Sequence, residues 1–189
     1  MSRKVTAGCI AACLVLSILF LYGSPTAGAQ EQIAVGATVK TQIACGESAS
    51  VSEPYDATIT LFEIVRGPEA LKRIKAAGNS NPDPAAGFEY ILANVHFELK
   101  ARGVPGDKTF ELARALQFTA LSAGFEEYAA PALVLPKPEL KRRVASGDKA
   151  EGWIAFAVKQ GEAKPLMLFD PSSGGAVARG KSLLFRLYQ

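Results

Sequence analysis

Apolar residues alternate along residues 88–99, read FEYILANVHFEL, and this stretch is the clearest structural signal in the chain. Side chains of a β-strand point alternately to its two faces, so one face of this stretch carries only apolar residues. These residues are Ile91, Ala93, Val95, Phe97 and Leu99. The opposite face begins apolar and then carries Asn94, His96 and Glu98. The pattern predicts a long central strand of an antiparallel sheet, covered on both faces at one end and on one face at the other.

Further elements are predicted on either side of this strand. Alternation or a short apolar run predicts strands within residues 33–39, 56–66, 116–121, 152–158, 165–169 and 181–188. One helix is predicted over residues 68–77, read PEALKRIKAA, because Pro68 suits a first helical position and Gly78 suits a C-cap. Leu71 and Ile74 should then face inward.

Small and polar residues gather in residues 45–54 (CGESASVSEP) and 171–180 (PSSGGAVARG), which predicts loops there. Residues 110–115 fit the period of a helix or of a strand, and the choice is left open. Prolines within residues 131–138 predict an extended crossing outside the central sheet. Roughly seven or eight short strands with one helix are typical of an all-β, immunoglobulin-like antiparallel β-sandwich.

The first 29 residues have the composition of a signal peptide. Arg3 and Lys4 precede an apolar run over residues 10–22, and Ala27 and Ala29 flank a small-residue cleavage site. An uncleaved membrane anchor is the alternative, but the run is shorter than the roughly 20 residues that span a bilayer. A lipoprotein signal at Cys13 is disfavoured, because the apolar core follows this cysteine instead of preceding it.

We therefore expect three parts, with a signal peptide preceding the sandwich. Residues 1–29 are the signal peptide, residues 30–56 an N-terminal extension or linker with a possible first strand, and residues 57–189 the sandwich domain. Cleavage would remove Arg3 and Lys4 but no acid, so 21 basic residues fall to 19 against 18 acidic ones and the net charge becomes +1. A nearly neutral domain gives no reason to expect nucleic acid as a partner.

Few residues of the processed chain offer chemistry. Cys45 would be its only cysteine, which excludes an internal disulfide, and no basic neighbour lowers its pKa. It is interpreted as a small residue of a flexible stretch, against the alternative of a reactive thiol. The basic residues at 72, 73 and 75 are interpreted as a solvated helix face. The loop acids Asp83, Glu126 and Glu127 lack the spacing of a calcium loop.

His96 is the only histidine of the chain, and it shares a strand face with Asn94 and Glu98. A metal site would need a further strong ligand, and no hydrolase or phosphate-binding motif is present. We interpret His96 as part of a wet sheet face, and Trp153, between apolar neighbours, as a core residue. The sequence therefore predicts no catalytic, cofactor-binding or metal-binding residue and no cofactor.

Several segments in this order resemble a family of secreted bacterial domains, the domain of unknown function 4352, a telokin-like β-sandwich. The segments are residues 59–67 followed by the helix, 87–92 (GFEYIL), 118–128, 146–156 (SGDKAEGWIAF) and 185–188 (FRLY). The resemblance covers residues 57–188, and its most specific part is the polar turn that leads into EGWIAF. It implies an extracellular location and a sandwich fold, and it implies no catalytic residues.

Two function classes follow from these observations. The first is a non-catalytic secreted or cell-envelope module that binds an extracytoplasmic protein or glycan, with membrane attachment only if the signal segment is retained. The second is a metal-dependent or hydrolytic extracellular protein that uses His96. The absence of motifs favours the first, and a structure in which His96, Glu98 and a neighbouring acid converge would favour the second.

Overall fold

The predicted central strand is β4, Phe88–Ala101, and all five residues of its apolar face are buried. This computed structural model describes residues 31–48, 51–103, 108–113, 116–173 and 178–189. On the opposite face of β4, Tyr90 and Leu92 are buried whereas Glu98 is exposed. The expected change from a covered to an open face along this strand is therefore confirmed.

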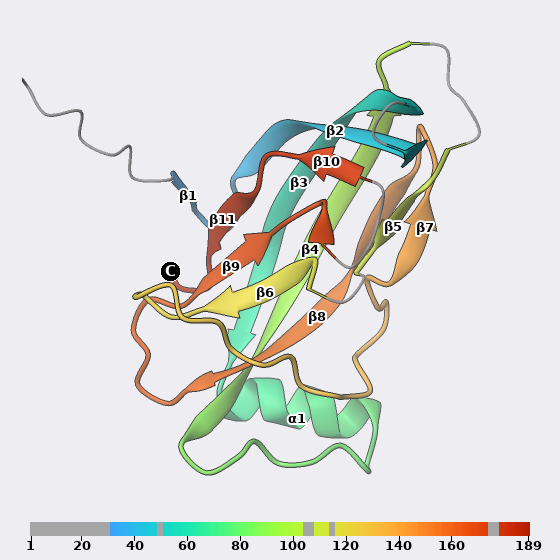
Figure 1. Cartoon of the computed structure of the whole chain (residues 1–189). Coiled ribbons are helices and arrows are strands. Elements are labelled where there is room, and N and C mark those ends of the chain that lie inside the picture. Colours follow the sequence, from blue (N-terminus) through green and yellow to red (C-terminus); the bar gives the residue numbers. More distant parts are fainter. Residues whose placement is uncertain (1–30, 49–50, 104–107, 114–115, 174–177) are drawn as a thin grey trace, which may run out of the picture.

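Two sheets face each other across the core (Figure 1). The larger sheet has the strand order β10-β2-β3-β4-β8, where β2 is Thr38–Ser48, β3 is Val51–Arg66, β8 is Lys149–Lys159 and β10 is Ala178–Gly180. The smaller sheet has the order β1-β11-β9-β6, formed by Gln32–Ile33, Leu183–Arg186, Leu166–Phe169 and Phe118–Leu121. A two-stranded ribbon joins β5, Phe110–Leu112, to β7, Arg142–Val144.

The main core lies between these two sheets. It joins apolar residues of β3, β4 and β8 to Met167, Phe169 and Phe185 of the smaller sheet. Among the named strands of the described residues, all pairs are antiparallel except β1 with β11, which is parallel. The expected all-β sandwich with one short helix is confirmed, because two antiparallel layers bury one apolar core between them.

The helix α1, Pro68–Ala77, lies across the lower end of the larger sheet in Figure 1, on the face away from the main core. Ala70 and Ile74 pack there against Val65, Tyr90, Leu92 and Trp153 in a second apolar cluster. Pro68 opens the helix and Gly78 caps it, as expected. Because this helix covers the outer face locally, the apolar start of that face is buried.

Trp153 is 8% exposed and belongs to this second cluster. Its expected burial is confirmed, although it packs under α1 and not between the sheets.

One predicted loop is wrong. Residues 45–54 were expected to be a loop, yet β2 continues through Cys45 to Ser48 and β3 begins at Val51. The two strands pair from Thr38↔Thr60 to Ser48↔Val51, so they form a long hairpin. Small polar residues weaken the local strand signal, but cross-strand pairing supplies the stabilisation that local propensity lacks.

The second predicted loop, residues 171–180, also contains a strand. Its last three residues form β10, which pairs with β2 at Ala178↔Cys45. The helix-or-strand ambiguity of residues 110–115 is resolved as strand for Phe110–Leu112.

A β-bulge interrupts the alternation of β3. The register with β4 shifts between Leu61 and Glu63, which leaves Phe62 unpaired and 57% exposed. The extra residue of such a bulge reverses the faces on which the following side chains lie. Val65 therefore joins the cluster under α1, while Ile64 packs against the main core. Strict alternation from the core residues Ile59 and Leu61 would instead place Val65 in the main core and Ile64 on the outer face.

The proline-containing segment between β6 and β7, residues 122–141, passes beside α1 without forming a named strand, as expected, and is called the crossing segment. Asn81, which is 4% exposed, holds it in place. Its Nδ2 donates to the carbonyl oxygens of Ile74 and Val134 at 2.7 and 2.8 Å, and its Oδ1 accepts from the N–H of Val134 at 2.7 Å. One buried amide therefore joins the C-terminal turn of the helix to the crossing segment.

The predicted signal peptide, residues 1–29, lies outside the described residues. Within the part of the chain that the structure describes, no helix is both long enough and apolar enough to cross a membrane.

Cys45 is 3% exposed and is the free cysteine of the described chain, so its interpretation as part of a flexible stretch is wrong. Burial, with a smaller contribution from the charge of Glu53, raises the pKa of its thiol from 9.0 to about 11.

We expect the Cys45 thiol of the folded protein to react slowly with a thiol reagent near neutral pH, and to react fully after unfolding. Rapid reaction of the native protein would contradict this burial.

The pH dependence of stability follows from the same shift. Because the folded thiol holds its proton more tightly than the unfolded one, its contribution to stability is complete below about pH 9. That contribution is lost as the pH rises through about 11.

Because Cys45 is a free cysteine, the melting temperature of the protein should be unchanged by reductant at neutral pH. A clear decrease of the melting temperature with reductant would reveal a disulfide.

Candidate binding pocket

A pocket of about 480 Å³ opens on the outer face of the larger sheet, beside α1. Its floor is formed by Phe88 and Tyr90 of β4 with Ala157 of β8. Tyr128 and neighbouring residues of the crossing segment form one wall. A concave site of this size that combines apolar walls with a few polar groups has the general character of a ligand pocket.

The strand register creates the floor of the pocket. Tyr90 lies opposite Ala157, and Phe88 lies opposite Lys159. These residues point away from the main core, because their neighbours Ile91 and Phe156 occupy it. The small Ala157 beside a tyrosine leaves room above the sheet, whereas a larger residue would fill the space.

A tight turn after β6 brings the wall into place. Ser122 Oγ accepts hydrogen bonds from the N–H groups of Gly124 and Glu126 at 3.2 and 3.1 Å, and Phe125 has a φ of 65°. The chain then pairs back on β6, since the N–H of Tyr128 donates to the carbonyl of Ala120 at 2.9 Å.

The aromatic rings of the pocket are held at fixed angles. Phe88 and Tyr128 meet edge to face at 89°, with 6.4 Å between their ring centroids. Tyr90 is buried and donates its hydroxyl to the carbonyl of Pro82 at 3.4 Å. Edge-to-face packing of this kind restrains both rings.

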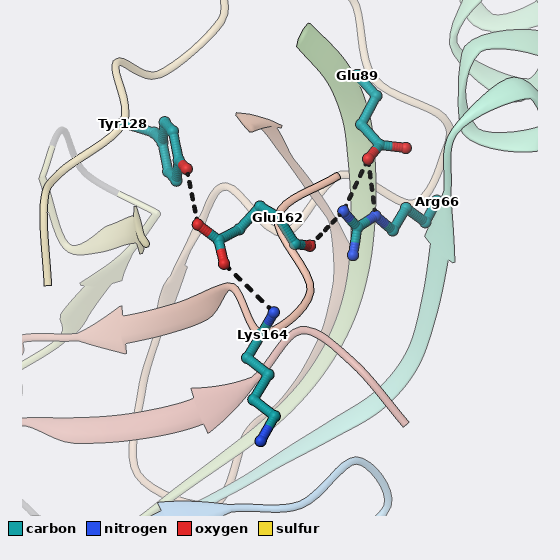
Figure 2. A network of polar contacts seen from close by, with 5 residues as sticks. All are labelled: Arg66, Glu89, Tyr128, Glu162 and Lys164. Atoms are coloured by element: carbon teal, nitrogen blue, oxygen red, sulfur yellow. Dashed lines mark hydrogen bonds and ion pairs between the residues drawn. The ribbon is translucent and has the colours of Figure 1, made fainter. Parts of the chain in front are cut away.

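Figure 2 shows the polar network behind Tyr128. Its hydroxyl donates to Oε2 of Glu162 at 3.3 Å, and Oε1 of the same carboxylate accepts from the backbone N–H of Lys164 at 3.3 Å. Arg66 donates from Nη2 to the carbonyl of Glu162 at 2.6 Å, and from Nε and Nη2 to Oε1 of Glu89 at 3.0 and 2.7 Å. The network ties the end of β3, the start of β4 and the turn after β8 to the pocket wall.

The network also sets the electrostatics of Tyr128. Desolvation raises the pKa of its phenol above 10.0, and the negative charge and hydrogen bond of Glu162 raise it further, with a smaller contribution from Glu126. Desolvation also raises the pKa of Tyr90, with a contribution from Asp83. Both phenols are therefore hydrogen-bond donors at neutral pH, and Tyr128 lies in a negative local field.

The rim carries three charged residues, Glu126, Glu127 and Lys159. All three are exposed, and none takes part in an ion pair within the described residues. Sequence reasoning noted the two glutamates only as loop acids. It missed the aromatic residues, because these lie in segments separated by about forty or more positions.

His96 lies outside this pocket, on the open part of the same sheet face. Its ring stacks on Phe62, with 4.6 Å between centroids and an interplanar angle of 12°. Nε2 lies 3.4 Å from Oε2 of Glu151, but the pair lacks hydrogen-bond geometry, and Glu98 pairs with Lys149 instead. Among the residues that the structure describes, no three His, Cys, Asp or Glu side chains are grouped to hold a metal ion.

The face around His96 is less wet than expected. Its neighbour Asn94 is 5% exposed, because it lies opposite Trp153 in the register with β8. The interpretation of Asn94 as a wet residue is therefore wrong.

Replacing His96 by alanine should change the free energy of unfolding by less than about 1 kcal/mol, because the partly exposed ring loses only its stack on Phe62 and its contact with Glu151, which is not a hydrogen bond. Thermal melts of both proteins with and without chelator provide the measurement. A midpoint that falls with chelator in the wild type alone would reveal a metal site at His96.

The basic cluster on α1 is engaged in contacts within the chain. Arg73 pairs with Glu63 and Glu69, and its guanidinium lies 5.6 Å from the ring centroid of Trp153. Lys75 pairs with Asp83 at 3.0 Å. These contacts agree with its interpretation as a helix face and not as a binding patch.

No family model matches the chain, and no curated protein matches it. Two solved structures from Bacillus subtilis are similar. The ycdA chain of strain 168, described as a "putative lipoprotein", aligns over 69% of this chain at 13% identity with a TM-score of 0.46. The match spans 36% of the ycdA chain. The yjhA protein aligns over 82% of this chain and 98% of its own length, at 11% identity with a TM-score of 0.48.

Proposed function

We propose that this protein is a non-catalytic binding module, secreted or held in the cell envelope, and that the aromatic pocket is its ligand site. The observation that carries the proposal is the pocket itself, a preformed concavity of about 480 Å³ with aromatic walls and unpaired charges at its rim. Its partner would be an extracytoplasmic protein segment or glycan. The signal peptide predicted from the sequence for residues 1–29 supports this location.

The pocket is preorganised, which supports binding as its role. Glu162 and Arg66 restrain Tyr128 from behind, and Asn81 anchors the crossing segment that continues from it. A ligand would therefore meet rings that are already ordered and would lose little affinity to the ordering of side chains. The sandwich supplies the rigid frame, and the segment around Tyr128 supplies the contacts.

The resemblance to the domain of unknown function 4352 family over residues 57–188 agrees with such a role, and family membership is part of the proposal. A hydrolytic or metal-dependent function at His96 is the other candidate. The contact between His96 and Glu151 is the one observation that favours it, and the chelator melt described above tests it.

A fragment screen by two-dimensional NMR on the full chain tests the proposed site. We expect the signals that shift to cluster at Phe88, Tyr128 and Ala157. Tyr128→Ala should reduce the affinity of such fragments by about tenfold or more, the usual effect of removing a central aromatic contact.

Phe62→Ala is the matched control, because Phe62 is an exposed aromatic residue on the same sheet face outside the pocket. It should leave fragment affinity unchanged. Binding that clusters around Phe62 and His96, or binding that ignores Tyr128, would contradict the proposed site.

A further inference from the structure

We propose that the pocket recognises an organic cation, an alkylated ammonium or a guanidinium group. This inference rests on the proposed function, because it names the ligand class of the same site. Three features of the pocket carry it: the aromatic lining, the two rim glutamates without partners, and the carboxylate of Glu162 behind the wall.

The aromatic lining supplies the first attraction. Phe88, Tyr90 and Tyr128 all face the pocket, and the first and last of these meet at a right angle. A cation between such rings contacts the negative face of at least one of them, and cation–π attraction strengthens when the cation is partly desolvated. An alkylated ammonium also buries its methyl or methylene groups against the same rings.

The rim supplies the second attraction. Three other acids near this face of the sheet are already paired, Glu63 with Arg73, Glu98 with Lys149 and Asp83 with Lys75. By contrast, Glu126 and Glu127 form no ion pair within the described chain, so their charges are available to a ligand.

Among the described residues that line the pocket, Lys159 alone is basic, and it opposes a cationic ligand. The rim carries two negative charges and one positive charge, which leaves an excess of one negative charge. Glu162 adds a further negative charge behind Tyr128, where it also raises the pKa of that phenol. The net negative charge around the pocket therefore favours a cationic ligand. Removing the charge of Lys159 should strengthen binding, which is the opposite of the effect expected from removing the glutamate charges.

Choline and its uncharged carbon isostere, in which a quaternary carbon replaces the nitrogen, are the probes for charge. We expect choline to bind the full chain about tenfold more tightly than the isostere, the difference that a partly desolvated cation–π contact provides. The affinity for choline should fall with added salt, because the rim charges are exposed. Equal binding of both probes would overturn the inference and leave the proposed binding site standing.

Three charge variants test the rim with choline as the ligand. The double variant Glu126→Gln with Glu127→Gln should weaken binding about threefold to tenfold, whereas Lys159→Gln should strengthen it by a smaller factor. Lys181→Gln, at an exposed lysine outside the pocket, is the matched control and should change nothing. Weakening by Lys159→Gln, or no effect of the double variant, would overturn the inference.

A second pair of probes distinguishes the sources of the cation. An acetylated arginine amide represents a basic side chain of a protein partner, and choline represents a small alkylated amine. Whichever of these two cations binds more tightly identifies the source, whereas the need for a charge is decided by the comparison of choline with its isostere. If neither probe shifts the signals of Phe88 and Tyr128 while uncharged fragments do, the cation is excluded. If no compound of any charge binds there, the proposed function itself fails.

Discussion

Replacing Trp153 by alanine is expected to lower the free energy of unfolding by about 3 to 5 kcal/mol, the range measured for large aromatic residues removed from a core. Trp153 is 8% exposed and packs with Val65, Ile74 and Leu92 between α1 and the sheet. Its removal would leave a cavity there, and Arg73 would lose the ring that it covers.

Urea unfolding followed by circular dichroism measures this change, since the variant has no tryptophan left to report fluorescence. Trp153→Phe is the matched control, and it should cost clearly less because a ring still fills the site. Unfolding close to that of the wild type, together with lost ligand binding, would instead make Trp153 a surface contact.

Replacing Gly152 by alanine is expected to cost about 3 kcal/mol, although it adds a single methyl group. An added Cβ would overlap the backbone nitrogen of Leu140 and lie 2.6 Å from its Cα. The crossing segment is hydrogen-bonded to β8 at this point, since the N–H of Trp153 donates to the carbonyl of Pro138 at 2.8 Å. Neither backbone can move away without breaking that pairing.

Gly103→Ala is the matched control, because an added Cβ there meets no atom within 4 Å. It should be neutral or stabilising by less than about 1 kcal/mol, through a smaller entropy of the unfolded chain. The measurement is the difference between the two variants in urea unfolding. A Gly152→Ala protein as stable as the control would show that the crossing segment is free to shift from β8.

The glycine and the tryptophan of the EGWIAF segment, residues 151–156, have separate structural roles. The glycine allows a second backbone to approach β8, and the aromatic residue beside it fills the space under α1. The sequence indicated a strand with two apolar faces at this place. It did not indicate that the polypeptide covering the glycine would be the proline-containing crossing segment.

Local periodicity predicted the elements whose faces depend only on neighbouring residues. The two faces of β4 and the ends of α1 follow from residues within a few positions of each other, so a single segment contains the signal. Elements stabilised by distant pairing were missed. The sequence predicted a loop for part of the β2–β3 hairpin and a flexible position for Cys45. The polar sequence of β2 gives little local strand signal, and this strand is stabilised by pairing with β10 and β3.

The candidate site was not predictable from the sequence, and the reason is the distance between its parts along the chain. Phe88, Tyr128 and Ala157 become neighbours only through the register of β4 with β8 and the turn after β6. By itself, the sequence determined the sandwich class and the covered and open ends of the central strand, because alternation is a local property. Only the tertiary structure decided which loop covers which face, because pairing between distant segments sets that choice.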